Sequence, residues 1–258
     1  MLHSTSIVVL FLLGAAFASA LPGGLNQRIV GGKYAFKGQF PYQASLRWAN
    51  DDLFCGAVII NEKWVLTAAS CVPGPLIPSI RVVVGALQLR GDGTTHLIYD
   101  IIPHPGFNPV THENDIALIK LVEPIKFSDS VSSIKLEKDF SNENKAGAQA
   151  SGWGYTTYGG PKSSLLQWVE LNILTLEECR QKHTAENARF VFNSTICTLS
   201  DVGTGMCYGD AGGPLTHNGK LQGIVSWAIP CAKGYPDVFM RVSSYYSWIT
   251  EVTGLDFD

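Results

Sequence analysis

Short segments that are apolar throughout, or in which apolar and polar residues alternate, recur along the chain and are separated by turn residues. From Phe40 to Leu46, for example, Tyr42, Ala44 and Leu46 alternate with polar residues, which is typical of a strand with one buried face. Other segments are continuous apolar runs of strand length, typical of buried strands. The expected strands are Phe40–Leu46, Phe54–Ile60, Trp64–Ala69, Arg81–Leu89, Ile116–Leu121, Ala148–Trp153 and Leu221–Trp227. The pattern therefore predicts an all-β protein.

Two segments carry helical signals. Thr175 precedes Glu178 by three residues, which is the spacing of a capping box and predicts a short helix there. Near the end, Tyr245, Trp248, Ile249 and Val252 recur at helical spacing, and we expect a C-terminal helix over residues 244–253. The region from residue 120 to 145, rich in serine, asparagine and charges, is typical of a connection between two halves.

Composition and charge narrow the function classes. The chain has 258 residues, of which 46% are hydrophobic and 16% charged, so it can bury a large core. Its formal net charge of −3 gives no basic field for a phosphate backbone, and no cluster of basic and aromatic residues appears. We therefore expect no nucleic-acid partner.

The first residues resemble a secretory signal. The apolar run from Ile7 to Phe17 is too short to span a bilayer, and Ala18-Ser19-Ala20 has the small residues of a signal-peptidase site. We expect a signal peptide over residues 1–20, a short propeptide over 21–28 that ends at Arg28, no membrane anchor, and a secreted, extracellular protein.

The loop Gly209-Asp210-Ala211-Gly212-Gly213-Pro214 suggests a specific chemistry. It resembles the Gly-Asp-Ser-Gly-Gly-Pro signature of the chymotrypsin-like serine protease family, in which the serine attacks the substrate carbonyl. Here Ala211 holds the position of the nucleophile. The resemblance implies that Gly209 and Ala211 supply the backbone N–H groups of an oxyanion hole.

The other two catalytic positions of the family lie in equally clear motifs. Leu66-Thr67-Ala68-Ala69-Ser70-Cys71 resembles the family's Leu-Thr-Ala-Ala-His-Cys motif, with Ser70 in place of the general base. A serine hydroxyl cannot act as a base near neutral pH. Asp115 matches the aspartate that orients that base. His112, three residues earlier, is a candidate replacement base, but Ala211 would offer it no hydroxyl to activate.

The resemblance also implies maturation by cleavage. Ile29-Val30-Gly31-Gly32 follows Arg28 and is similar to the new amino terminus formed when this family is activated. We expect the freed amine of Ile29 to pair with Asp210, which would order the loops around Ala211.

The fold that the resemblance implies is two packed six-stranded antiparallel β-barrels with a short intermediate helix and a C-terminal helix. The protease-like domain would span residues 29–254, with barrels over about 29–135 and 140–242. Six cysteines leave many pairings open, and the resemblance selects Cys55 with Cys71, Cys179 with Cys197, and Cys207 with Cys231.

By the same resemblance, a specificity pocket surrounds Ala211 and is formed by Gly205 at its base, Met206 beside it, Ser226, Trp227 and Ala228 along one wall, and Asp237 opposite. Glycine at 205 with aspartate at 237 is similar to the broad-specificity collagenolytic members of arthropods. Two alternatives stay open: the pocket binds a side chain, such as a basic one, without cleavage, or Met206 fills it.

No metal or cofactor site is expected. The loop around Asp92 matches the calcium loop of some relatives, but Ala86 stands where they carry an acidic residue, and one carboxylate is poor ligation for calcium. The sequence has no CxxC zinc spacing. Asn193 is a candidate N-glycosylation site within Asn193-Ser194-Thr195.

These observations predict a catalytically inactive, zymogen-like serine protease homologue. It would be a monomer that binds an extracellular protease, protease inhibitor or peptide segment, as an inhibitor decoy, a cascade cofactor or a component of a secreted fluid. The alternative is a serine endopeptidase with residual or relocated activity that uses Ser70 or His112.

Overall fold

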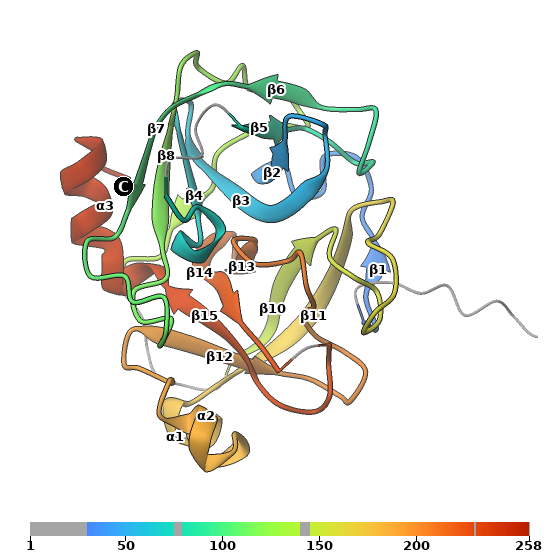
Figure 1. Ribbon diagram of the computed structural model, residues 1–258, viewed down its shortest axis with the longest axis vertical. Coiled ribbons are helices and arrows are strands. Elements are labelled where there is room, and N and C mark those ends of the chain that lie inside the picture. The colour runs from blue at the N-terminus through green and yellow to red at the C-terminus, as the bar shows by residue number, and fades with distance from the viewer. Residues whose placement is uncertain (1–29, 75–78, 140–144, 230, 258) are drawn as a thin grey trace, which may run out of the picture.

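The computed structural model describes residues 30–74, 79–139, 145–229 and 231–257, which form two mainly antiparallel sheets, one above the other in Figure 1. The predicted signal peptide, the propeptide and Ile29 lie outside the described residues.

The first sheet has seven strands in the order β6-β5-β2-β3-β4-β8-β7. Its strands are β2 (Gln43–Trp48), β3 (Leu53–Asn61), β4 (Trp64–Thr67), β5 (Ile80–Val84), β6 (Thr94–His96), β7 (Ile98–Pro103) and β8 (Ala117–Leu121). Among the described residues, the outermost strands β6 and β7 do not pair with each other, so this sheet is a half-barrel.

The second sheet closes into a barrel. Its strands are β1 (Lys33–Tyr34), β9 (Lys135–Leu136), β10 (Lys145–Gly152), β11 (Gln167–Leu174), β12 (Thr195–Leu199), β13 (Pro214–His217), β14 (Lys220–Trp227) and β15 (Asp237–Arg241). The path β11-β10-β13-β14-β15-β12 returns to β11 through a β11–β12 pairing and makes a six-stranded ring. The predicted all-β fold of two packed barrels is thus confirmed, although the first sheet has seven strands and stays open.

Helices are few. The described helices are α1 (Leu176–Lys182), α2 (Ala185–Ala188) and α3 (Tyr246–Thr253), with 3₁₀ turns at Ala69–Cys71 and Val242–Tyr245. The predicted capping box is present: the Thr175 side chain accepts from the Glu178 N–H, and the Glu178 carboxylate accepts from the Thr175 N–H. At the other end of the chain, Gly254 in the left-handed conformation ends α3.

Several expected strand limits were wrong. The strand expected from Phe40 begins at Gln43, and the one expected to reach Ala69 ends at Thr67. The strand expected over residues 81–89 ends at Val84, since Gly85 has a φ of +70° and turns the chain out of the extended conformation.

Each sheet has its own core. Buried aliphatic side chains fill the first sheet, and Ile249 from α3 and Met240 from β15 join them, so this core crosses between the two halves. A smaller cluster that includes Phe239 and Leu171 fills the second barrel. The two sheets are therefore fixed against each other by apolar packing, and the loops that meet between them are held in place.

Candidate active site

The glycine-rich loop that precedes β13 is packed against a strand of the other sheet. The Gly56 N–H on β3 donates to the carbonyl of Ala211 over 2.8 Å. A side chain at Gly212, whose φ is +81°, would collide with the Gly56 carbonyl and with Thr67, so only glycine allows this close approach. The backbone of the predicted signature loop is thus held between the two sheets, with a methyl group at its centre.

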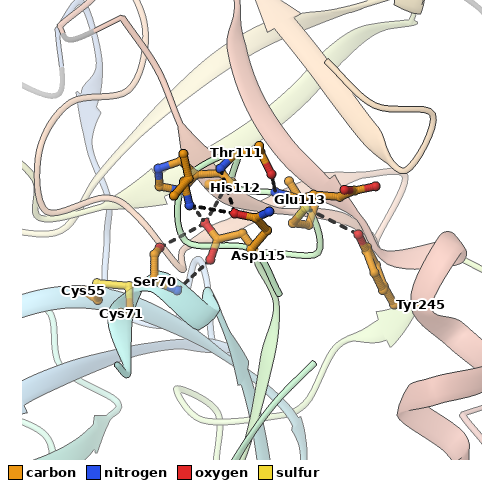
Figure 2. A network of polar contacts seen from close by, with 12 residues as sticks. Cys55, Ser70, Cys71, Thr111, His112, Glu113, Asp115 and Tyr245 are labelled. Atoms are coloured by element: carbon orange, nitrogen blue, oxygen red, sulfur yellow. Dashed lines mark hydrogen bonds and ion pairs between the residues drawn. A yellow bond between two sulfur atoms is a disulfide. The ribbon is translucent and has the colours of Figure 1, made fainter. Parts of the chain in front are cut away.

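Asp115 lies on the loop just before β8 and is fully buried. Its Oδ1 accepts from the Ser70 N–H at 2.6 Å, and its Oδ2 accepts from the Ser70 hydroxyl at 3.0 Å (Figure 2). A second hydroxyl, that of Ser226 on β14, donates to Oδ2 at 2.6 Å. The structure therefore brings Ser70 and Asp115 together as expected, with Ser70 acting as a hydrogen-bond donor to the carboxylate.

His112, which lies on the same loop three residues before Asp115, also approaches this carboxylate (Figure 2). Its Nδ1 lies 3.5 Å from Asp115 Oδ2, a long contact, and its side chain is 38% exposed. Interaction with Asp115 raises the pKa of His112, although partial burial opposes this change. His112 thus faces the carboxylate that orients a catalytic histidine in the family's motif.

Asp210 is buried beneath the loop. Its Oδ1 accepts from the Gly154 N–H at 2.8 Å, and its Oδ2 accepts from the Cys207 N–H at 3.1 Å. Burial raises the pKa of Asp210 to about 7, while these hydrogen bonds oppose the shift. Its predicted partner Ile29 is outside the described residues, so the pair stays a prediction.

A cavity of about 210 Å³ opens beside Ala211. Its lining consists of Met206, Cys207, Tyr208, Gly209, Ala211, Val225, Ser226, Trp227 and Ala228. Four of the predicted pocket residues, Met206, Ser226, Trp227 and Ala228, are among them, and a cavity persists beside the buried Met206.

The other two predicted pocket residues, Gly205 and Asp237, lie behind this lining. Asp237 is buried and its Oδ2 accepts from the Met206 N–H at 2.8 Å. A Cβ atom at Gly205 would stand 2.7 Å from the same oxygen. Burial also raises the pKa of Asp237 to about 7, with the charge of Asp210 adding to the shift. Asp237 therefore holds the backbone of the pocket lining through its hydrogen bond to Met206.

Sequence reasoning missed two features of the site. Ser226 was expected only as a pocket wall, yet it is also a donor to Asp115, and no local pattern signals a contact between β14 and the loop before β8. Tyr208 also lines the cavity. Its position between Cys207 and Gly209, next to the predicted oxyanion hole, could have identified it as a site residue.

The disulfides and the candidate glycosylation site lie around this centre. All three expected pairs form, with Cα–Cα distances of 6.1 Å for Cys55–Cys71, 6.0 Å for Cys179–Cys197 and 4.5 Å for Cys207–Cys231. Asn193 is exposed in the turn before β12 and accepts from Arg180 at 3.1 Å. Within the described ranges, no group of three or more His, Cys, Asp or Glu side chains is arranged to hold a metal ion, and no helix could span a membrane.

Comparison with known proteins gives a consistent result. Residues 29–249 match the family model described as Trypsin. The chain is 38% identical to chymotrypsin-2 of Vespa crabro over 223 residues, which cover 86% of this chain and 98% of that protein. It is 37% identical to trypsin II-P29 of Gallus gallus over 253 residues, which cover 95% and 96% of the two chains.

Proposed function

Because this chain belongs to the trypsin family, we propose that it is a secreted, non-catalytic member that acts by binding protein or peptide partners. The observation that carries the proposal is the Ser70–Asp115 pair, in which both the N–H and the hydroxyl of Ser70 donate to the carboxylate. The carboxylate is in place, while the group that it would orient is a serine, and residue 211 is an alanine.

The magnitude of these two losses supports the proposal. In subtilisin, removal of either the serine or the histidine alone lowers turnover by about 10⁶-fold, and what acceleration persists comes from binding and the oxyanion hole. The two effects are not additive, so a chain without its serine gains little from a histidine. Ser70 and Ala211 together are therefore what we expect of a protein retained for binding.

The surroundings of the cavity suit a protein partner. Tyr208 at its wall is half exposed, and its ring lies 6.3 Å from that of Tyr155 and 6.2 Å from that of Tyr158. Tyrosines are enriched at protein interfaces because they combine a large apolar ring with a hydroxyl that stays hydrogen-bonded. We infer that an extracellular inhibitor, protease or peptide segment binds over this tyrosine cluster.

A second candidate function is favoured by one observation, the approach of His112 to Asp115. In that reading the chain is a serine endopeptidase with relocated activity, in which Ser70 or His112 replaces the family's groups. The Ser70 hydroxyl is already donated to Asp115, however, and in that state its oxygen keeps its proton.

The main test is turnover after cleavage behind Arg28. The protein, freed of the activating protease, is assayed against a broad panel of peptide and ester substrates beside the S70H, A211S and S70H/A211S variants. We expect no turnover from wild type or from either single variant, and turnover at least 10³-fold above background from the double variant. Wild-type turnover abolished by Ser70→Ala or His112→Gln would instead establish the second function.

Two further measurements separate the candidates. A phosphonate that labels activated serines should react with the double variant and leave wild type unmodified, whereas a covalent adduct on Ser70 would contradict the proposal. Affinity capture from the source fluid with cleaved protein should retain an inhibitor, protease or peptide, with a Tyr208→Ala/Tyr158→Ala variant as the matched control.

A further inference from the structure

The loop around Ala211 presents two backbone donors without acceptors. The N–H groups of residues 210, 212 and 213 each donate to a backbone carbonyl. Within the part of the chain that the structure describes, those of Gly209 and Ala211 donate to none. Both residues line the 210 Å³ cavity, so a ligand oxygen there would gain two hydrogen bonds that the loop does not otherwise make.

The methyl group of Ala211 changes which oxygen ligand these donors suit. In an active relative, a serine oxygen stands beside them and attacks a neutral carbonyl. Because the histidine of such a relative holds the serine proton, a carboxylate placed there would face the lone pairs of the serine oxygen. The Ala211 side chain has no oxygen, so this repulsion is absent.

The cavity next to the donors has the size and lining for one apolar side chain. Its volume is below the range of about 300–1,000 Å³ that is typical of pockets for drug-sized ligands. Met206, Val225, Trp227 and Ala228 line it, and Asp237 is hidden behind Met206 with its oxygen bonded to the Met206 N–H. A basic side chain would therefore find no exposed carboxylate in this cavity.

The acidic groups around the cavity, Asp115, Asp210 and Asp237, each accept hydrogen bonds from neighbouring donors. Ser226, which lines the cavity, donates to the Asp115 carboxylate, and Ser70 and His112 face the same carboxylate. At the tyrosine cluster, the exposed Lys233 ammonium stands 4.7 Å above the ring of Tyr158. The negative charge of Asp115 is thus surrounded by donors, and a cation stands near the rim.

We infer that this site recognises the free C-terminal carboxylate of a peptide, with the carboxylate on the Gly209 and Ala211 N–H groups and an apolar last side chain in the cavity. The inference rests on the proposed function, because a protein that cleaved such segments would not hold them. The expected ligands are therefore the C-terminal ends that proteolysis leaves, and an uncut peptide segment should bind more weakly.

The test uses full-length protein cleaved behind Arg28 and isothermal titration calorimetry. The probes are acetylated tetrapeptides ending in leucine or phenylalanine, each as the free acid, as the amide, and extended by two alanines. We expect the acid to bind at least tenfold more tightly than the amide or the extended peptide, a difference of about 1.4 kcal/mol. The S70H/A211S variant, in which the histidine accepts the serine proton, should bind the acid at least fivefold more weakly than wild type does. Ala185→Ser adds the same hydroxyl on the exposed face of α2, outside the cavity lining, and should leave the affinity for the acid unchanged.

Each outcome bears on one claim. If the amide or the extended peptide binds as tightly as the acid, the carboxylate inference is wrong, while binding without turnover still supports the proposed function. Absence of binding by every probe also overturns the inference. Turnover of the extended peptide by wild type would overturn the proposed function itself.

Discussion

At the scale of single residues, His112 contacts the buried carboxylate from a strained backbone conformation. Its backbone is left-handed, with a φ of 56°, which is uncommon outside glycine. The ring ends 3.5 Å from the carboxylate of Asp115. The motif predicted Asp115 and Ser70 from sequence, whereas this orientation depends on backbone angles that no residue pattern specifies.

The first prediction concerns the charge of His112. Its NMR titration should give a pKa above 6.5, and Asp115→Asn should lower that pKa, because the hydrogen bond to Asp115 favours the protonated ring. The resulting stabilisation is complete below the unfolded pKa of about 6.5 and disappears as the pH rises through the folded pKa. It should stay below about 1 kcal/mol, since the ring is 38% exposed.

The control for this titration is Asp52→Asn. Asp52 pairs with Lys162 at 3.2 Å, whereas His112 contacts Asp115. The Asp52→Asn substitution should leave the pKa of His112 unchanged. A His112 pKa at or below 6.5 in wild type would contradict the predicted interaction.

A second prediction concerns His183, a buried histidine after α1. Neither of its ring nitrogens has a hydrogen-bond partner among the described residues, and its ring lies 5.1 Å from that of Trp227. Because an unsatisfied buried polar group costs about 1–3 kcal/mol, His183→Phe should raise the free energy of unfolding by about 1 kcal/mol. His183→Asn, which keeps a polar group and loses ring contacts, should lower it.

The pH dependence of these variants gives an independent check. Burial lowers the pKa of His183, so the unfolded chain binds the proton more readily, and stability falls as the pH drops below about 6.5. In urea unfolding at pH 7.5 and pH 5, wild type should lose more stability than His183→Phe. Equal losses would show that the ring is protonated inside the fold.

At the scale of elements, the loop after β5 is closed by one of its own side chains. The Asp92 carboxylate accepts from the Leu87 N–H at 2.9 Å and from the Gln88 N–H at 3.0 Å, and so closes the loop on itself. The sequence predicted that Asp92 would not suffice for calcium. It did not predict that this side chain would bind the loop's own backbone donors.

The third prediction follows from that loop. Asp92→Ala should lower the free energy of unfolding by about 1–2 kcal/mol, because it removes charge-assisted hydrogen bonds to two backbone donors. Asp92→Asn keeps one oxygen acceptor and should lose less. Thermal unfolding of wild type should give the same Tm with calcium or with EDTA, whereas a higher Tm in calcium would reveal a metal in the loop.

The other elements differ in whether neighbouring or distant residues determine them. The capping box at Thr175 and the apolar runs of β3 and β8 depend on neighbouring residues, and these were predicted from sequence. The limits of β5 depended on the φ of Gly85, and the open edge of the first sheet depends on pairings between distant strands. Pairings between distant strands cannot be predicted from the sequence of one segment. The family resemblance predicted a closed six-stranded barrel for the first sheet, which was only approximately right.

At the scale of the whole molecule, the start of the described chain docks against the pocket base. The carbonyl of Val30, the first described residue, accepts from the Gly205 N–H at 3.1 Å, so the chain next to Ile29 docks against the pocket base. Asp210 and Asp237, both with a pKa raised to about 7, are buried on the inner side of that base. The family motif predicted the Ile29–Asp210 pair, and the burial of a second aspartate beside it came from the fold.

The last prediction is that cleavage behind Arg28 changes how stability depends on pH. In uncleaved protein, the pKa of Asp210 is about 7 when folded and about 3.9 when unfolded, so the folded state binds the extra proton and stability falls as the pH rises between these values. After cleavage, the freed amine of Ile29 should hold Asp210 ionised, and this fall should shrink. The charge of Asp210 also raises the pKa of Asp237, so the assignment to Asp210 depends on a variant that removes its charge.

Urea unfolding of both forms at pH 5 and pH 7.5 measures this change. The cleaved protein should gain stability over the uncleaved one at pH 7.5 and gain less at pH 5, where the uncleaved protein keeps Asp210 neutral. Asp210→Asn is the matched control, because it fills the same space without a charge and should remove the difference between the two forms. If cleaved and uncleaved protein respond to pH alike, the amine of Ile29 does not reach Asp210.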